Sequence, residues 1–408
     1  MKRAIVFVLA VFMLAGFVSC SKKEKVEEIT LTFGSWRPDD VEQMKNLFDL
    51  YHQQFPNVNI VFEPVNPQDY NEVILKKLQA GSTPDLLCVR SFATGYDLYS
   101  SGYLADCTGI SGIKEAFTEM VRSAWSAPDG KIYAVPFAAV SHAMYYNKAI
   151  FQKEGISVPK TWEEFLQICK KLKSLGYTPL ANGYAEEWDI LECFFLGGVI
   201  PDFVGGGNDR VLYEDGKVPL NDEKFVAAYQ AMADIAPYLP ENASKIYYKD
   251  SKNLFKQQKA VMMMDGSWTA GEYSDVDFSW GLFALPAPAG RNTIICFHPD
   301  MAISVNAKST HQREARAFLS WLCTINGAKT VADCLPSGYF TVSTYNFPLA
   351  DVNANRFLLL NKGKDIDARF IWPKLIDLYK PMNDAILAVI KGEKTPKQAA
   401  DYVAAARK

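Results

Sequence analysis

The chain has 408 residues, with 43 Lys and Arg against 46 Asp and Glu and a formal net charge of −3. This balance provides no basic surface, which argues against nucleic acid and anionic membrane surfaces as partners. Aromatic residues make up 13% of the chain, and exposed rings are one way to hold the flat apolar face of a ligand. The length exceeds what one hydrophobic core usually organises, so we expect two lobes or domains.

The N-terminus has the pattern of an export signal. Lys2 and Arg3 precede an uncharged run over residues 4–18, which is too short to span a bilayer comfortably. No other uncharged run in the chain approaches that length. We therefore expect residues 1–19 to be a signal peptide and the remainder of the chain to be exported.

A cysteine closes this signal and a charged stretch follows it at once. Ser19 directly before Cys20 is similar to the lipobox of bacterial lipoproteins, in which the signal is cut before the cysteine and the thiol then carries a lipid. Phe17 stands where leucine is usual. Residues 20–28 have the composition of a solvated tether. We expect anchoring through Cys20, with a plain secretory signal as the alternative, at the outer face of the cytoplasmic membrane or in the periplasm.

Strands and helices alternate at the start of the exported part. Apolar residues recur at every second position in the first expected strand, the third is a continuous apolar run, and apolar residues recur at helical spacing in the expected helices. The strands are expected at 29–33, 58–65 and 85–89, and the helices at 41–55 and 67–81. This order is typical of a parallel sheet that is covered by helices on both faces.

The same kind of pattern restarts after residue 151. Thr161 and Glu164 form the pattern of a capping box at one helix start, and Pro381 is expected to interrupt the long helix near the C-terminus. Further helices are expected at 161–176, 221–235, 311–333 as a pair, 372–391 and 395–408, and strands at 260–264, 280–288 and 301–307.

Few residues suggest catalysis. The four histidines show no zinc-binding spacing, and the glycines of 205–209 lack the Lys-Ser/Thr pair of a phosphate loop. The seven cysteines after Cys20 form no CxxC motif and are expected to be buried free thiols. Carboxylates such as those in "AEEWD" leave a glycosidase pair open as an alternative. We expect no cofactor and no metal.

Several short motifs occur in the order typical of one family. They are "LTFGSW", "AGSTPDLLCV", "SSGYLADCT", "DGKIYAVPF", "MYYNKAIFQKEGISVPKTWEEF", "FKQQKAVMMMDGSW" and "GLFALPAPAG". On these motifs, nearly the whole exported chain resembles the extracellular solute-binding proteins of bacterial carbohydrate ABC importers, the maltose-binding-like group. Gln258 replaces the usual glycine of its turn, and "LPSGYF" departs from the family's shorter turn, which affects any assignment near Tyr339.

The resemblance implies a particular α/β architecture. It is the two-lobe periplasmic-binding-protein fold, in which strands cross between the lobes more than once and a ligand cleft lies between them. The N-terminal lobe would hold 29–138 plus 299–342, and the C-terminal lobe 139–298 plus 343–408. The crossings would fall at "PFAAVSH", "FHPDMAI" and "YFTVSTY". Such hinges work when a few backbone dihedrals absorb the motion.

Polar and aromatic residues at strand ends are candidates for the N-terminal face of the cleft. Ligands of parallel sheets bind beyond the carboxyl ends of the strands. A sugar ring has an apolar C–H face that suits indole and a rim of hydroxyls that suits planar hydrogen-bonding groups. The candidates are Trp36 and Arg37 after the first strand and Arg90 and Ser91 after the third.

The resemblance implies the candidates of the C-terminal face. Trp268 of "DGSW" corresponds to the family's stacking tryptophan, and Tyr379 lies near its late aromatic contact, with Trp372 as the rival. The set consists of His142 and Tyr145 past the first crossing, Glu187 and Trp188 in "AEEWD", Asp265 and Trp268, His298 and Asp300 at the second crossing, and Tyr379.

These residues predict a monomeric receptor that captures a sugar and delivers it to the permease of an ABC importer, without catalysis. Several rings favour an oligosaccharide over a monosaccharide. The alternatives are the same fold with a polyamine, metal complex or peptide as its ligand, and an exported carbohydrate-active enzyme.

Overall fold

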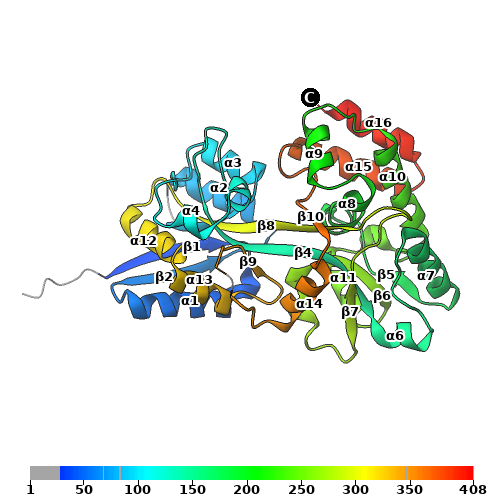
Figure 1. The fold of residues 1–408 in the computed structure, drawn as a ribbon, viewed down its shortest axis with the longest axis horizontal. Helices are drawn as coiled ribbons and strands as arrows, with labels where there is room; N and C mark the ends of the chain where they lie inside the picture. The colour runs from blue at the N-terminus through cyan, green and yellow to red at the C-terminus, as the bar shows by residue number, and fades with distance from the viewer. Residues whose placement is uncertain (1–27, 68, 82–83, 346, 408) are drawn as a thin grey trace, which may run out of the picture.

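The computed structural model describes residues 28–67, 69–81, 84–345 and 347–407. Two lobes lie side by side in Figure 1, and the long strands β4 (Val135–Asn147) and β8 (Ile294–Val305) run from one lobe into the other. The expected signal peptide, Cys20 and nearly all of the tether lie outside the described residues.

The N-terminal lobe is built on the alternating start of the chain. Strand β1 pairs in parallel with both β2 and β3, and β8 joins the sheet antiparallel to β3. Its strands are β1 (Ile29–Ser35), β2 (Val58–Pro64) and β3 (Leu86–Arg90), and its main helices are α1 (Val41–Gln54), α2 (Tyr70–Ala80), α3 (Ala93–Ser100), α12 (Gln312–Leu322) and α13 (Ile325–Cys334). The predicted parallel sheet is therefore present, with the antiparallel β8 added to it.

Strand β4 joins the two lobes through two different partners. Its first half pairs with β8, from Val135 opposite Ile303 to Ser141 opposite Phe297. Its second half, from His142 onward, pairs with β6 (Ala260–Gly266) and β7 (Trp280–Phe283). The short strand β9 (Phe340–Thr341) also pairs with β4, at Ala138 and Ala139. Three chain segments therefore meet where the lobes join.

The C-terminal lobe packs helices around β5 (Thr178–Leu180), β6 and β7, and β10 (Asp365–Asp367) adds to the end of β8. Its helices are α6 (Lys148–Lys153), α7 (Trp162–Ser174), the π-helix η2 (Trp188–Val199), α8 (Ile200–Phe203), α9 (Gly207–Glu214), α10 (Glu223–Ile235), α11 (Tyr248–Lys256), α14 (Val352–Asn361), α15 (Tyr379–Ile390) and α16 (Pro396–Ala406). Short helices α4 (Ile113–Ala116) and α5 (Glu119–Ser123) belong to the other lobe.

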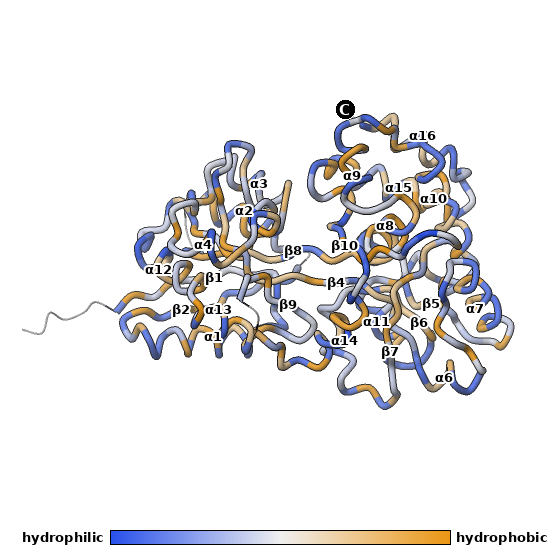
Figure 2. The backbone as a smooth tube through the Cα atoms, viewed as in Figure 1, coloured by the Kyte–Doolittle hydropathy of each residue, from blue (hydrophilic) through white to orange (hydrophobic). Residues whose placement is uncertain are grey.

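The buried apolar side chains form three clusters. One, the N-terminal core, includes Phe33 and Trp125 and lies in the N-terminal lobe. The other two, the C-terminal cores, centre on η2 with α10 and on the ring of Tyr145. In Figure 2 the hydrophobic colour follows the inner strands and helix faces of each lobe. Each lobe therefore buries its own apolar surface, as separate lobes require.

Three local predictions need correction. Pro381 does not interrupt a helix, because α15 begins only at Tyr379 and holds the proline in its first turn, where a missing N–H costs nothing. The capping box at α7 is half formed, since Thr161 accepts from the Glu164 N–H but the Glu164 carboxylate accepts from the N–H of Lys160. Helix α10 is capped by Asp222, one residue later than predicted.

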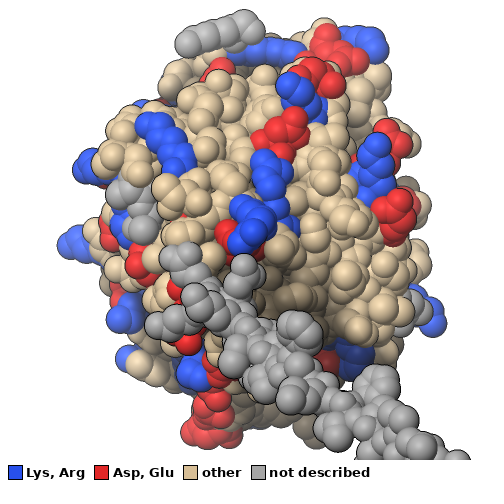
Figure 3. Space-filling view, turned by 90° about the vertical axis from the view of Figure 1, so that its left-hand side faces the viewer, with Lys and Arg blue, Asp and Glu red and all other residues tan. Residues whose placement is uncertain are grey.

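Among the described residues, no single helix has the length and apolar character needed to cross a membrane. One bent pair of helices, Trp188–Phe203 with Gly207–Glu214, has enough length and apolar composition when the two are taken together. On the face drawn in Figure 3, Lys and Arg are interspersed with Asp and Glu over a largely uncharged surface.

Candidate ligand site between the lobes

A buried arginine forms the centre of a polar cluster on the C-terminal side of the lobe junction. Arg369, which follows β10, has no exposed surface. Its Nη1 lies 2.7 Å from Glu192 Oε2, and its Nη2 lies 3.1 Å from His142 Nε2. These contacts join a loop, the π-helix η2 and the crossing strand β4. A buried ion pair with an added hydrogen bond fixes such a junction in one geometry.

Three tryptophans surround this guanidinium. Its Cζ lies 4.3 Å from the ring centroid of Trp372, 5.0 Å from that of Trp188 and 5.5 Å from that of Trp268. The rings of Trp188 and Trp268 are themselves 5.9 Å apart. Cation–π contacts of this kind are strongest when desolvated. Because Arg369 is buried while Trp188 and Trp268 are partly exposed, the cation lies behind an indole surface that remains accessible.

The indole of Trp268 is held by its neighbours in β6 and α11. Its Nε1 donates to the hydroxyl of Tyr248 at 2.8 Å, and that hydroxyl donates to Asp265 Oδ1 at 2.8 Å. A Cβ at Gly266 would lie 2.0 Å from the Trp268 ring, so only glycine lets the indole fold back over the strand end. The N–H of Trp268 is thus satisfied within the protein, and its ring is partly exposed.

The π-helix η2 supplies the next part of the site. It begins at Trp188 and contains Glu192. Helices of this type are rare and are frequent at functional sites. Glu192 is also hydrogen-bonded to the hydroxyl of Tyr379, and burial raises the pKa of this carboxyl despite the nearby arginine. Glu187, one residue before η2, is exposed.

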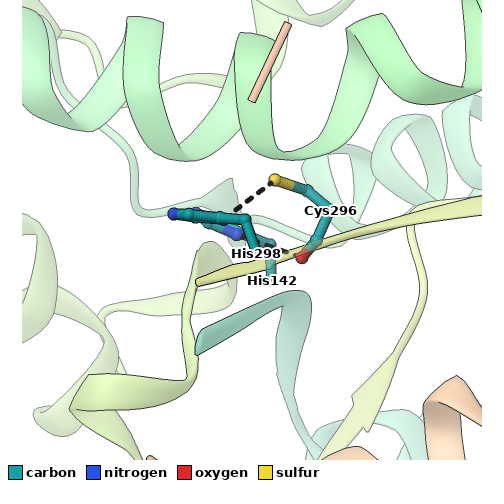
Figure 4. Close-up of side chains that lie close together, drawn as sticks. All are labelled: His142, Cys296 and His298. Carbon is teal, nitrogen blue, oxygen red and sulfur yellow. Dashed lines mark hydrogen bonds between the residues drawn. The ribbon is translucent and has the colours of Figure 1, made fainter. Parts of the chain in front are cut away.

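Two histidines and a cysteine lie together where β4 and β8 cross, as Figure 4 shows. The potential ligand atoms of His142, Cys296 and His298 are within 4.8 Å of one another. Arg369 can only donate, so His142 Nε2 must accept, and the proton then sits on Nδ1, which faces the Cys296 carbonyl at 3.4 Å. Both ring nitrogens are thus committed to protein partners. We interpret the cluster as hydrogen bonding that holds the crossing, since a metal ion would have to displace the guanidinium.

The N-terminal lobe contributes an arginine stacked on a tryptophan. Arg90 Cζ lies 4.6 Å from the ring centroid of Trp36, and Trp36 packs edge-on against Tyr70. Trp36 is 4% exposed, so it supports Arg90 more than it faces solvent. Ser91 follows directly after the Arg90–Met301 pair of strands β3 and β8. The carboxyl end of β3 therefore brings a cation and a hydroxyl to the lobe junction.

Three buried polar atoms at this junction have no hydrogen-bond partner in the described structure. They are Ser91 Oγ, His298 Nε2 and Arg369 Nε. Asp300 Oδ1 lies 3.6 Å from His298 Nε2, which is too long for a hydrogen bond. Buried polar groups are almost always paired, so these three atoms are exceptions, as are Gln43 Oε1, Asp202 Oδ2, Tyr229 Oη and Asn383 Oδ1 elsewhere in the described residues.

Some predicted site residues have other roles. Tyr145 does not face the other lobe: it is fully buried in a C-terminal core, and its hydroxyl donates to the Gly266 carbonyl at 2.8 Å. Asp265 is fully buried as well and acts on Trp268 only through Tyr248. Arg37 makes a two-point contact with Asp40, at 3.0 and 2.9 Å. Alternation along "MYYNK" could not tell which tyrosine faces the core.

The remaining predicted residues divide between the two lobes at the junction. His142, His298 and Asp300 come from the crossing strands, Glu187, Trp188, Trp268 and Tyr379 from the C-terminal lobe, and Trp36, Arg90 and Ser91 from the N-terminal lobe. The sequence reasoning missed Arg369, Glu192 and Tyr248. Only Glu192 carried a signal, as an acidic residue within an apolar run.

Two buried carboxyls next to the site predict a pH dependence of stability. Burial raises the pKa of Asp189 to about 7 and that of Asp265 to about 6. The two carboxyls therefore hold their protons up to a higher pH in the folded protein than in the unfolded chain. Their contribution to the free energy of unfolding is fully present below about pH 4 and is lost as the pH rises through about 7. We expect the melting temperature to fall between about pH 5 and about pH 8. Asp189→Asn should flatten this slope; an unchanged slope would contradict the role of Asp189.

Comparison with known proteins identifies a family and several relatives of this chain. The profile of the family described as bacterial extracellular solute-binding protein matches residues 35–324. The multiple sugar-binding protein of Streptococcus mutans is 24% identical over 342 residues, which are 81% of this chain and 79% of that protein. The maltotriose-binding protein of Pyrococcus abyssi is 26% identical over 309 residues, 71% of this chain and 61% of that one.

Solved structures share the fold. The bacterial solute receptor AcbH, described as having an exclusive substrate preference for β-D-galactopyranose, superposes with a TM-score of 0.80 at 19% identity, covering 92% of this chain and 97% of its own. The two-lobe fold predicted from the sequence is thus confirmed. Since the family profile covers most of the described chain, this protein belongs to the bacterial extracellular solute-binding proteins.

Proposed function

We propose that this protein captures a carbohydrate between its lobes and delivers it to the permease of an ABC importer, without catalysis. The observation that carries the proposal is the partly exposed indole pair of Trp188 and Trp268, backed by Arg369, beside three unpaired buried polar atoms. Indole faces suit the C–H face of a sugar, and unpaired donors and acceptors suit its hydroxyls. The names of the multiple sugar-binding and maltotriose-binding relatives agree with this ligand class, whereas other relatives are named for sn-glycerol-3-phosphate.

The charge balance at the junction favours a neutral ligand. Arg369 is compensated by Glu192 at 2.7 Å, and Asp300 lies beside His298 and is influenced by Arg90. An anionic ligand would call for an excess of cations, and a polyamine for an excess of carboxylates. The two signs are balanced here. We propose a neutral sugar, and the number of rings favours an oligosaccharide.

The enzyme alternative has little support from the carboxylates near the indoles. Glu192 is engaged with Arg369, and Asp265 is held by Tyr248 below the ring of Trp268. A glycosidase needs one carboxyl free to donate a proton and a second free to act on the sugar or on water. We therefore propose a receptor rather than a hydrolase.

A thermal-shift screen tests the ligand class. Neutral mono- and oligosaccharides, amino acids, polyamines and sugar phosphates are each added to the purified exported chain. A ligand that binds only the folded protein raises its melting temperature in proportion to ln(1 + [L]/Kd). We expect stabilisation by at least one neutral sugar. Stabilisation by a polyamine or an amino acid alone would overturn the proposal.

We also propose lipid anchoring through Cys20, with signal peptidase cutting after Ser19. Two acyl chains on a mature N-terminal cysteine anchor a protein durably, which a single chain does not. We expect Cys20→Ala to move the protein from the membrane fraction to the soluble exported fraction. The matched control is Cys334→Ala, which alters a partly exposed free thiol of the folded part and should leave the protein membrane-bound. A Cys20→Ala protein that stays in the membrane fraction would disprove anchoring at this residue.

A further inference from the structure

Phe92, directly after the candidate residues Arg90 and Ser91, contacts the apolar cores of both lobes. Its half-buried ring packs against the N-terminal core, to which its own segment belongs, and also against the C-terminal core around η2. The next residue, Ala93, donates its backbone N–H to the Trp372 carbonyl at 3.5 Å. The start of α3 is thus attached to the opposite lobe at two adjacent residues.

The backbone of Phe92 is in a conformation that favours glycine. Its φ is 61° and its ψ is −133°. Gln258 is the other non-glycine residue with a positive φ in the described structure. Such conformations are strained for residues with a Cβ, and they persist only where surrounding contacts hold them. Here the Phe92 N–H donates to the Ala124 carbonyl at 2.7 Å, and its carbonyl accepts from the Tyr133 hydroxyl at 3.2 Å. The N-terminal lobe therefore keeps Phe92 in the strained state.

A tryptophan makes the reciprocal contact. Trp268 belongs to the C-terminal lobe, yet its partly buried ring packs against the N-terminal core. Each lobe thus places one aromatic ring against the core of the other. Trp268 is part of the proposed ligand surface, whereas Phe92 belongs to the segment after β3. Apolar contact across two separately packed lobes stabilises the arrangement in which they touch.

We propose that Phe92 is an interlobe latch, a residue that sets ligand affinity by stabilising the closed arrangement of the lobes. The expected effect of Phe92 on ligand affinity rests on the proposed function. The expected effect on the shape of the ligand-free protein rests on the fold alone. Local contacts hold Phe92 in the strained backbone state, and that state directs its ring to the other lobe. Affinity is raised because a larger share of the ligand-free protein is already in the binding-competent arrangement.

Two variants separate the ring from the backbone. Phe92→Ala removes the ring and keeps the strain, whereas Phe92→Gly removes both. Small-angle scattering on the ligand-free protein should show a larger radius of gyration for both variants than for the parent. The glycine variant should melt about 2–4 °C above the alanine variant, because strain is relieved only there. Phe92→Leu, which keeps apolar bulk, should lie between the parent and the alanine variant.

Affinity for the sugar found in the thermal-shift screen should fall about tenfold in both variants, mostly through faster dissociation. An unchanged ligand-free radius in both variants would overturn the latch. A larger radius with unchanged affinity would overturn its role in binding while leaving the interlobe contact in place. The radius needs no ligand, so a failure of the proposed ligand class would not be mistaken for a failure of the latch.

Discussion

Replacing Arg369 by methionine is expected to destabilise the protein by about 3–5 kcal/mol, because it leaves Glu192 buried without its counter-charge. Arg369 has no exposed surface, and its Nη1 lies 2.7 Å from Glu192 Oε2, inside the C-terminal lobe. The loss should lower the melting temperature by on the order of 10 °C. Thermal and urea unfolding of the purified variant measure it.

A double-mutant cycle gives the control. Glu192→Leu alone leaves the guanidinium with His142 as its polar partner and should cost a similar amount, whereas Arg369→Met combined with Glu192→Leu should recover much of the loss. Lys380→Met breaks an exposed pair with Asp384, where the lysine side chain is 79% exposed, and should change stability by at most about 0.5 kcal/mol. If Arg369→Met had as little effect as Lys380→Met, the central ion pair would not exist as described.

Trp268→Ala is expected to weaken sugar binding by about tenfold or more, and it is the largest effect that we predict on function. The variant removes a ring whose N–H is already satisfied by Tyr248, so the loss concerns the ring face and its packing against the N-terminal core. A stacked ring contributes roughly 0.5–1.5 kcal/mol beyond its area burial, and about 1.4 kcal/mol corresponds to tenfold in affinity. Calorimetric titration of parent and variant measures the difference.

The control for Trp268→Ala is Tyr402→Ala, which removes an exposed aromatic ring of α16, away from the lobe junction. It should bind the sugar with the affinity of the parent. Circular dichroism should show both variants folded. Equal affinities of parent and Trp268→Ala for a sugar that both bind would place the stacking surface elsewhere.

Much of the fold was predictable because local signals and burial agree. Helix α1 begins behind acidic residues and ends before Pro56, and Gly81 takes the left-handed conformation that ends α2. Strand β2 alternates between buried and exposed residues over its first half, whereas β3 is a continuous buried run, as in a sheet covered on both faces. Pro381 misled the prediction because the same residue breaks a helix interior and suits a helix start, and the sequence alone does not say where the first turn lies.

The site was predicted only where a motif or a strand end pointed to it. Trp268 and Trp188 were found through their motifs. Arg369 was not, because it is a single arginine in "DARFIW" whose partners, Glu192 and His142, are 177 and 227 residues away in the chain. Phe92 carries no signal either, since its backbone conformation arises from contacts with Ala124 and Tyr133. The roles of such residues are set by long-range packing, which no local sequence pattern shows.

The most direct test of the central claim is a titration of the exported chain with the oligosaccharide that stabilises it best, followed by recovery of the ligand. The account predicts saturable binding with one site per chain and an oligosaccharide recovered intact, with no new reducing ends after prolonged incubation. New reducing ends, or saturable binding that Trp268→Ala and Arg369→Met both leave unchanged, would contradict a sugar receptor whose site lies between the lobes.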